Sequence, residues 1–406
     1  MKRIFSAYLS LPSNIVSVII ADFFLQVINA GFTLLLNFLM LEHGFKDYEI
    51  AGMVGNRYLT VLLCSVPLAL WAKGRRMKPF LLAGSVLSPI VALLIIFGIH
   101  THNSGLIRLL MSLWGISFSL LQVLAMPYIL LNGKRNKETS AIALFFAVAN
   151  ISIILTGSLS FALPHITSFF NTERLLILFC LSAFAGIYFI QKLPDEENIS
   201  KAVPVNGIYN GYDWNLIFEA AIPTFLIAFG AGFTIPVINL FFYDVHGMDA
   251  VNFSLMSTAT FFLVTLSGLL VPEVKIRFGY RTAITGVQSV AIVLLFVLAT
   301  TEWYTHVAAG LWVAIISYTL RQPLMNMAAP ITGELTMKYV GEKNRELVSA
   351  INTSIWSGCW FASAKIFAIL REAGVSYSNI IFITVGCYIF GVWWYHRLIR
   401  KVEQLT

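Results

Sequence analysis

Charged side chains are scarce in this sequence. Asp, Glu, Lys and Arg make up 12% of its 406 residues, whereas hydrophobic residues make up 58%. A soluble domain carries about 25% charged and about 45–50% apolar residues, so this chain has too little charge to cover a surface that faces water. Its mean hydropathy of +0.79 agrees. The composition excludes a soluble globular class and indicates an integral membrane protein.

Signatures of enzymes and metal centres are also missing. The four cysteines stand at unrelated spacings without a Cys-x-x-Cys pair, so we expect neither disulfides nor structural zinc. The histidines show no metal-ligand spacing, and neither a Walker-type loop nor a Gly-x-Ser-x-Gly elbow is present. The sequence therefore predicts a protein that is not an enzyme, carries no cofactor or metal, and does not hydrolyse ATP by itself.

Long apolar segments recur along nearly the whole chain. A helix needs about 20 apolar residues to cross a bilayer. We therefore expect an all-α membrane protein with twelve transmembrane helices, near residues 14–41, 48–71, 79–100, 106–131, 139–163, 173–192, 215–243, 250–271, 280–300, 306–333, 346–370 and 377–397. The first segment contains Asp22 and lacks an Ala-x-Ala-like exit, so it is predicted to be a retained span and not a cleaved signal.

A polar stretch at 193–213 is the only long non-apolar segment in the interior. It predicts a linker between two six-helix halves, residues 1–192 and 214–406. Most Lys and Arg residues stand at the N-terminus, in every second loop, in the linker and after the last span. By the positive-inside rule, both termini and the linker are predicted to be cytoplasmic. The net charge of +7 follows from this topology, so we predict no nucleic-acid partner.

Short patterns of the first half recur in the same order in the second half, at offsets of 201 to 209 residues. The pairs are Gly31-Phe32-Thr33 and Gly232-Phe233-Thr234, Asn37 and Asn239, His43-Gly44 and His246-Gly247, Pro67 with Gly74 and Pro272 with Gly279, and Asn136-Lys137-Glu138 with Ser140-Ala141 and Asn344-Arg345-Glu346 with Ser349-Ala350. Parallel repeats of this kind place a solute site between the halves near the membrane midplane, and rocking of the halves opens that site to each side in turn.

The loop after the second span carries the most specific local pattern. The stretch from Pro67 to Arg76 resembles the G-x-x-x-D-R-x-G-R-[KR] motif of the major facilitator superfamily of secondary transporters, and the resemblance covers essentially the whole chain. Gly74, Arg75 and Arg76 match the motif, but Trp71 replaces its aspartate. The resemblance implies that fold, with two pseudo-symmetric six-helix bundles.

A second copy of the motif follows span 8 and keeps Arg277, Gly279 and Arg281, with Ile276 at the acidic position. The resemblance implies that the matching residues of both copies form a cytoplasmic gate, although the charge contacts of the family's aspartate are missing. The glycine-proline pattern that drug/proton antiporters of the family carry in span 5 is also absent, between Val148 and Phe161. A drug-efflux function thereby loses its main sequence support.

One face of the first span is polar. Asp22, Gln26, Asn29, Thr33 and Asn37 follow one another at steps of three or four residues. Such a face lines a water-filled cavity or forms hydrogen bonds between helices. Asp22 lies about 12 Å inside the cytoplasmic boundary at 1.5 Å per residue. Asp22 is our candidate for proton coupling. Burial favours the protonated form of its carboxyl group, whereas exposure to water favours the charged form. The alternative is a fixed ion pair with a buried cation.

Three cations stand inside predicted spans: Arg57, Arg321 and Lys365. Lys365 lies nearer a membrane surface and can snorkel. Because these three cations outnumber the single carboxylate Asp22, the spans carry an excess of positive charge unless Glu219 or Glu334 neutralises part of it. This excess favours an anionic solute bound by arginine. The predicted substrate-binding residues are Gln26, Asn29, Arg57, Gln122, Asn239, Arg321, Asn326, Asn352 and Trp356.

For the amides among these residues, packing between helices is the competing interpretation. His43 and His246, at the repeated outer ends of spans 1 and 7, are either turn residues at the membrane interface or proton-sensing gates. The tyrosines and other aromatic residues are attributed to lipid exposure and interface belts.

These observations predict a secondary active transporter, monomeric and embedded in the lipid bilayer of a plasma membrane, with a bacterial inner membrane favoured. It would move a small polar solute, with an anion favoured, by alternating access with proton coupling. Two alternatives stay open: export of amphipathic or lipid-like compounds, favoured by the many aromatic residues, and a receptor or assembly partner that transports nothing, favoured by the degenerate loop motif.

Overall fold

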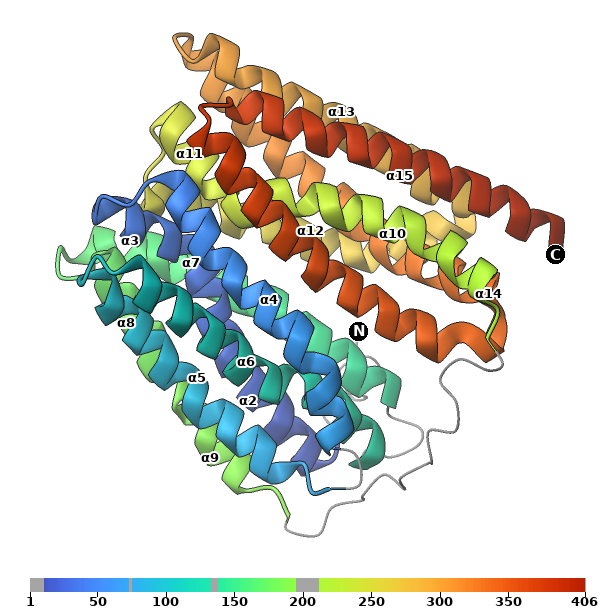
Figure 1. Ribbon diagram of the computed structural model, residues 1–406, viewed down its shortest axis with the longest axis horizontal. Helices are drawn as coiled ribbons and strands as arrows, with labels where there is room; N and C mark the ends of the chain where they lie inside the picture. The colour runs from blue at the N-terminus through green and yellow to red at the C-terminus, as the bar shows by residue number, and fades with distance from the viewer. Residues whose placement is uncertain (1–10, 73–74, 133–137, 195–211, 406) are drawn as a thin grey trace. The chain divides into compact units, whose positions relative to one another are not determined.

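A computed structural model describes residues 11–72, 75–132, 138–194 and 212–405. The described residues contain no strand, which confirms the predicted all-α class. The first half contains α2 (Ser13–Gly31), the π-helical turn η1 (Phe32–Leu36), α3 (Asn37–Glu42), α4 (Asp47–Ala72), α5 (Lys78–Ile99), α6 (Ser104–Asn132), α7 (Glu138–Ile166), α8 (Thr172–Ala183) and α9 (Ala185–Gln191), as Figure 1 shows.

The second half contains α10 (Trp214–Thr234), the 3-10 turn η2 (Ile235–Val237), α11 (Ile238–His246), α12 (Ala250–Tyr280), the π-helical turn η3 (Arg281–Gly286), α13 (Val287–Thr300), the 3-10 turn η4 (Thr301–Tyr304), α14 (Ala308–Glu372) and α15 (Tyr377–Leu405). Nine segments of the described residues are long and apolar enough to cross a membrane. The other three predicted spans coincide with α4 and with the two parts of α14.

Two of the loops that the sequence predicts between spans are almost entirely helical in the structure. The helix of α12 continues to Gly279, whose φ is 66°, and α14 runs through to Glu372 with a single interruption at Gly341, whose φ is 72°. Glycine tolerates positive φ because it has no Cβ. One residue in this conformation therefore turns the chain between two helices where the sequence led us to expect a loop.

The chain forms two compact units, each of which we describe separately. Unit 1 comprises Met1–Lys46, Asn56–Pro204 and Ala250–Leu255, and unit 2 comprises Asp47–Gly55, Val205–Asp249 and Met256–Thr406. The first residues of α4 thus belong to unit 2, and those of α12 to unit 1. Most of the predicted linker lies outside the described residues.

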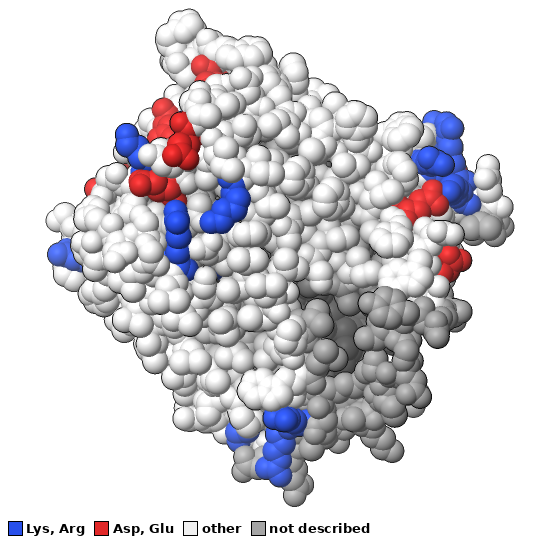
Figure 2. Space-filling model, in the orientation of Figure 1, with Lys and Arg blue, Asp and Glu red and all other residues white. Residues whose placement is uncertain are grey.

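Each unit is a bundle built around its first long helix. In unit 1, α2 packs against α6, α7, α8 and α9, and α5 packs against α6 and α8. In unit 2, α10 packs against α14 and α15, and α13 packs against the same two helices. Many large apolar side chains point outward, among them Leu94, Phe262 and Phe390. On the face shown in Figure 2, charged side chains gather near helix ends, as expected for helices whose middles contact lipid.

A glycine permits the close approach of α4 and α6 in unit 1. A Cβ built on Gly115 would lie 2.7 Å from the carbonyl oxygen of Arg57 and would also collide with the Thr60 hydroxyl. Small residues let membrane helices approach in this way. At Gly386 of α15, by contrast, an added Cβ would meet no described atom within 4 Å beyond its chain neighbours and the nearby backbone of its own helix.

We expect Gly115→Ala to lower the free energy of unfolding by about 1–3 kcal/mol, because the methyl group would push the two backbones apart. Thermal unfolding in detergent measures the effect, and Gly386→Ala is the matched control. Equal unfolding temperatures for the two variants would contradict the prediction.

Candidate functional site

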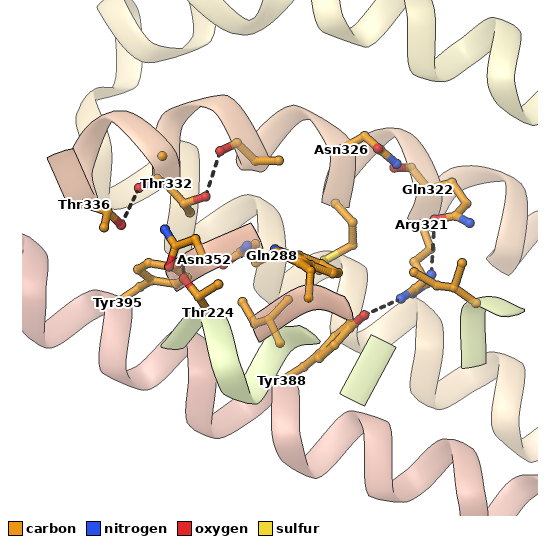
Figure 3. Close-up of a pocket in the computed structure, with 16 residues that line it drawn as sticks. Thr224, Gln288, Arg321, Gln322, Asn326, Thr332, Thr336, Asn352, Tyr388 and Tyr395 are labelled. Atoms are coloured by element: carbon orange, nitrogen blue, oxygen red, sulfur yellow. Dashed lines mark hydrogen bonds between the residues drawn. The ribbon is translucent and has the colours of Figure 1, made fainter. Parts of the chain in front are cut away.

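A cavity of about 230 Å³ opens inside unit 2 among α10, α13, α14 and α15. Figure 3 shows its labelled side chains in two groups, with Gln288 between them. Arg321, Gln322 and Asn326 stand at one end, while Thr224, Thr332, Thr336, Asn352 and Tyr395 stand at the other. Met325, Trp356 and Tyr388 also line it. Four predicted substrate residues, Arg321, Asn326, Asn352 and Trp356, therefore come together here.

Arg321 is the dominant charge of this cavity. Its side chain is 1% exposed. One terminal nitrogen donates to the Tyr388 hydroxyl at 3.1 Å and the other to Gln322 Oε1 at 3.3 Å, while Nε has no partner among the described residues. No carboxylate of the described chain pairs with it. A buried cation held only by neutral groups attracts an anion strongly, because the protein interior screens charges much less than water does.

The two carboxylates that could neutralise Arg321 are engaged elsewhere. Glu334 pairs with Lys275 and, at 3.0 Å, with Lys338. Burial works to raise the pKa of Glu334, but hydrogen bonds from these lysines and from Tyr280 outweigh it and hold the pKa at about 2. Glu219 pairs with Lys401 at 2.5 Å. The positive charge of the cavity thus remains uncompensated within the described residues.

The middle and the other end of the cavity carry oxygen acceptors. Gln288 Oε1 and Asn352 Oδ1 are buried and have no hydrogen-bond partner among the described residues. The hydroxyls of Thr332 and Thr336 donate to carbonyl oxygens of their own helix, at 2.9 Å in both cases. The protons of these hydroxyls are therefore occupied, and the Tyr395 hydroxyl interacts with both threonine side chains.

A second polar cluster lies inside unit 1. Arg57 donates to Asn29 Oδ1 at 2.7 Å, Asn29 to Gln26 Oε1 at 3.1 Å, and Gln26 to Gln122 Oε1 at 2.8 Å. The Arg57 guanidinium carbon also lies 4.0 Å from the ring centroid of Trp114. All four predicted substrate residues of the first half are thus joined in one hydrogen-bonded chain.

Asp22 precedes this chain by one turn of α2 and is 1% exposed. Neither of its carboxylate oxygens has a hydrogen-bond partner among the described residues, and no cation there pairs with it. The alternative of a fixed ion pair with Arg57, Arg321 or Lys365 therefore finds no counterpart in the described structure.

Comparison with known proteins identifies the family. The model of the Major Facilitator Superfamily matches residues 16–364. The chain belongs to this superfamily. Family and fold identify a membrane transporter rather than an enzyme. No curated protein sequence matches the chain significantly.

Solved facilitator structures share the fold at low sequence identity. A nucleoside transporter, NupG, superposes with a TM-score of 0.72 at 12% identity, covering 95% of this chain and 99% of that one. An inward-facing bacterial homologue of the iron transporter ferroportin superposes with a TM-score of 0.73 at 11% identity, covering 95% of this chain and 98% of that one. A D-xylose-proton symporter superposes with a TM-score of 0.72 at 14% identity, covering 96% of each chain. These likenesses establish the fold of this facilitator.

Other predicted residues of this facilitator lie outside both clusters. Asn239 is 1% exposed, its Oδ1 accepts from the backbone N–H of Leu240 at 3.0 Å, and it does not line the cavity. Lys365 donates to the carbonyl oxygen of Gly52 at 2.8 Å. His43 Nε2 lies 3.2 Å from His100 Nδ1, and His246 Nε2 lies 3.0 Å from Thr301 Oγ1.

The predicted gate is described only in part, because Gly74 lies outside the described residues. Arg75 and Arg76 are exposed, and the Arg75 guanidinium carbon lies 5.6 Å from the Trp71 ring centroid. In the second copy, Arg277 and Arg281 are exposed and Gly279 forms the break in α12. Their role in gating stays a prediction.

Several cavity residues were not among the predicted site residues. Gln288 is a lone amide in an apolar helix, and the rule that selected Gln122 would have selected it too. Tyr388 and Tyr395 are 1% and 4% exposed and line the cavity. Their assignment to lipid-facing or interface positions was wrong, because their helix also has a face that packs inward.

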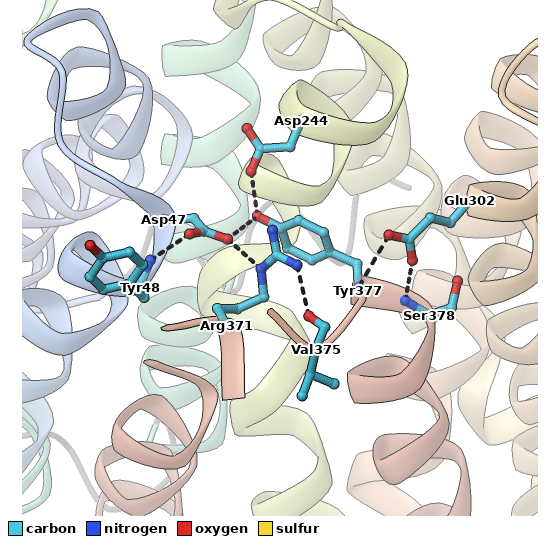
Figure 4. A network of polar contacts seen from close by, with 8 residues as sticks. All are labelled: Asp47, Tyr48, Asp244, Glu302, Arg371, Val375, Tyr377 and Ser378. Atoms are coloured by element: carbon cyan, nitrogen blue, oxygen red, sulfur yellow. Dashed lines mark hydrogen bonds and ion pairs between the residues drawn. The ribbon is translucent and has the colours of Figure 1, made fainter. Parts of the chain in front are cut away.

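A separate network joins the ends of four helices in unit 2, as Figure 4 shows. Arg371 pairs with Asp47, and its guanidinium carbon lies 3.9 Å from the ring centroid of Tyr377. The Tyr377 hydroxyl contacts Asp47 Oδ2 at 3.0 Å and Asp244 Oδ2 at 2.7 Å. The Tyr377 hydroxyl thus contacts both carboxylates, and the positive charge of Arg371, which pairs with Asp47, offsets their mutual repulsion.

We expect Arg371→Met to lower the free energy of unfolding by about 1.5–3 kcal/mol, because a partly buried, charged hydrogen-bonded group loses its partner. Adding Asp47→Asn should recover part of the loss in a double-mutant cycle. Lys401→Met, at a more exposed ion pair, should cost at most about 1 kcal/mol. Additive losses for Arg371 and Asp47 would refute the coupling.

Proposed function

We propose that this facilitator transports a small polar solute carrying an anionic group, which Arg321 binds in the cavity of unit 2. The observation that carries the proposal is the buried Arg321 guanidinium, which no described carboxylate neutralises and whose Nε faces no acceptor. A carboxylate, phosphate or sulfate would supply that acceptor through paired hydrogen bonds. Solute passage by alternating access belongs to this proposal.

We further propose that transport is coupled to protons through Asp22. An ionised carboxylate that is buried without a partner is costly, so the enclosed site suits the protonated acid. Exposure of the same carboxyl to water would favour its charged form. One turn of the helix from Asp22, a hydrogen-bonded chain begins that runs from Gln26 through Asn29 to Arg57. This chain of polar contacts would couple a change of charge at Asp22 to the Arg57 cation.

A thermal-shift screen of the purified protein in detergent tests the class of solute. Anions, sugars, amino acids, peptides and cationic dyes are compared at matched concentrations. A ligand present at a hundred times its dissociation constant stabilises the protein by about 2.7 kcal/mol. We expect stabilisation by organic anions. Stabilisation by hydrophobic cations alone would replace this proposal with export of amphipathic compounds, and stabilisation by no solute together with no uptake would favour a non-transporting receptor.

A further inference from the structure

We propose that the cavity of unit 2 takes a hydroxylated organic anion, with its anionic group at Arg321 and its hydroxyl groups at the oxygen acceptors of the middle and the other end. The inference rests on the proposed function and narrows its substrate class. It follows from which hydrogen-bonding groups of the cavity are already used and which are left over.

The Arg321 end offers donors. Arg321 Nε has no partner among the described residues. The Asn326 amide stands at the same end of the cavity, and its nitrogen already donates to the carbonyl oxygen of Gln322 at 2.9 Å. Gln322 in turn donates to the Tyr318 hydroxyl at 3.1 Å and accepts from Arg321. These contacts hold the guanidinium in place and leave Nε as its donor without a partner among the described residues, which an anionic group can use.

The middle of the cavity and the end opposite Arg321 offer acceptors. Gln288 is 3% exposed, and its Oε1 lacks a partner, as does Asn352 Oδ1. The Thr332 and Thr336 hydroxyls donate to the helix backbone and interact with the Tyr395 hydroxyl, so the two amide oxygens are the acceptors left over. A buried acceptor without a donor costs free energy. A solute that brings hydroxyl donors to these oxygens removes that cost, whereas an alkyl chain does not.

The charge of the lining decides between hydroxyl and ammonium donors. None of the residues of the described chain that line the cavity is Asp or Glu. An ammonium group placed here would be buried without a counter-charge and beside a cation, which is strongly unfavourable. Neutral hydroxyl groups meet the same acceptors without that cost. The solute is therefore an anion with hydroxyl groups, and a zwitterion or an amino sugar is disfavoured.

The size of the cavity agrees with a compact solute. At about 230 Å³, its volume lies just below the range of about 300–1,000 Å³ that is usual for small-molecule pockets. In Figure 3, Arg321 and Asn352 lie on opposite sides of Gln288, and all three side chains line the same cavity. One molecule with an anionic group at one end and hydroxyl groups along its length can reach all three side chains.

Binding of matched probes to the purified full-length protein tests the inference. Gluconate and glucose 6-phosphate are hydroxylated anions, hexanoate is an anion without hydroxyl groups, sorbitol has hydroxyl groups without charge, and glucosamine is a hydroxylated cation. We expect at least one hydroxylated anion to bind about tenfold or more tightly than hexanoate and sorbitol, with glucosamine weakest. The carboxylate and the phosphate probes distinguish the two sources of anionic charge.

Two variants link the preference to the acceptors. Asn352→Leu should lower the affinity for the hydroxylated anion about tenfold and leave that for hexanoate unchanged. Gln288→Met makes the same test if Asn352→Leu does not fold. Asn252→Leu, on α12 away from the cavity, is the matched control and should change neither affinity.

The outcomes separate this inference from the proposed function. Equal binding of hexanoate and gluconate, lost in Arg321→Gln, would overturn the hydroxyl preference but keep an anion transporter. Tightest binding of sorbitol or glucosamine would overturn both. Failure of both hydroxylated anions to bind would also refute the inference, while an anion of another class found in the thermal-shift screen would leave the proposed function standing.

Discussion

Arg321→Ala is expected to abolish saturable binding and uptake of anionic solutes. Removing one partner of a buried, charged hydrogen-bonded pair costs about 2–5 kcal/mol, which corresponds to a loss of affinity of roughly 30-fold or more. Tyr388 and Gln322 would keep their positions but offer only neutral contacts. Arg321→Lys should retain part of the affinity, since it preserves the charge but not the paired geometry.

Equilibrium binding in detergent and uptake into proteoliposomes measure this effect. Arg108→Ala, which removes an exposed arginine from α6, is the control and should behave like the parent protein. Size-exclusion profiles and unfolding temperatures show whether the Arg321 variants are folded. A folded Arg321→Ala that binds anions with unchanged affinity would exclude this cavity as the anion site.

Asp22→Asn should abolish accumulation driven by a pH gradient while leaving solute exchange active. Asparagine has nearly the shape of a protonated aspartate but cannot release a proton, so the solute would equilibrate without being concentrated. We expect the accumulation ratio to fall toward one. The structural reason is that Asp22 is buried next to the polar chain of unit 1 and has no partner among the described residues that would keep it charged.

Proteoliposomes with an imposed pH gradient measure accumulation, and preloaded liposomes measure exchange. Asp249→Asn changes an exposed aspartate between α11 and α12 and serves as the control. Undiminished proton-driven uptake by Asp22→Asn would remove Asp22 from the coupling mechanism. Loss of exchange together with accumulation would indicate a structural role instead.

The candidate site could be predicted from the sequence only in part. Polar residues inside apolar spans are costly against lipid, and this rule found Arg321, Asn326, Asn352 and Trp356 of the cavity and every member of the polar chain in unit 1. It also selected Asn239, whose amide oxygen bonds to its own helix. A single sequence does not distinguish an amide that faces a cavity from one that caps a local backbone group.

The cavity residues that were not selected from the sequence show the same limit of single-sequence prediction. Tyr388 and Tyr395 resemble interface tyrosines by sequence, yet both turn inward toward the cavity. The threonines on α14 look like ordinary helix residues, because their hydroxyls bond to the preceding turn. Only the rotation of each helix about its axis decides which of these side chains reach the cavity.

The sequence by itself determined the membrane environment, the all-helical class, the order of the spans and the residues that could not be left facing lipid. These properties depend on hydropathy averaged over about 20 residues and on single costly polar groups. Tertiary structure decided which polar groups meet. The pairing of Glu219 and Glu334 with lysines, and the isolation of Arg321 from every described carboxylate, follow from helix packing over long sequence separations, which no local pattern encodes.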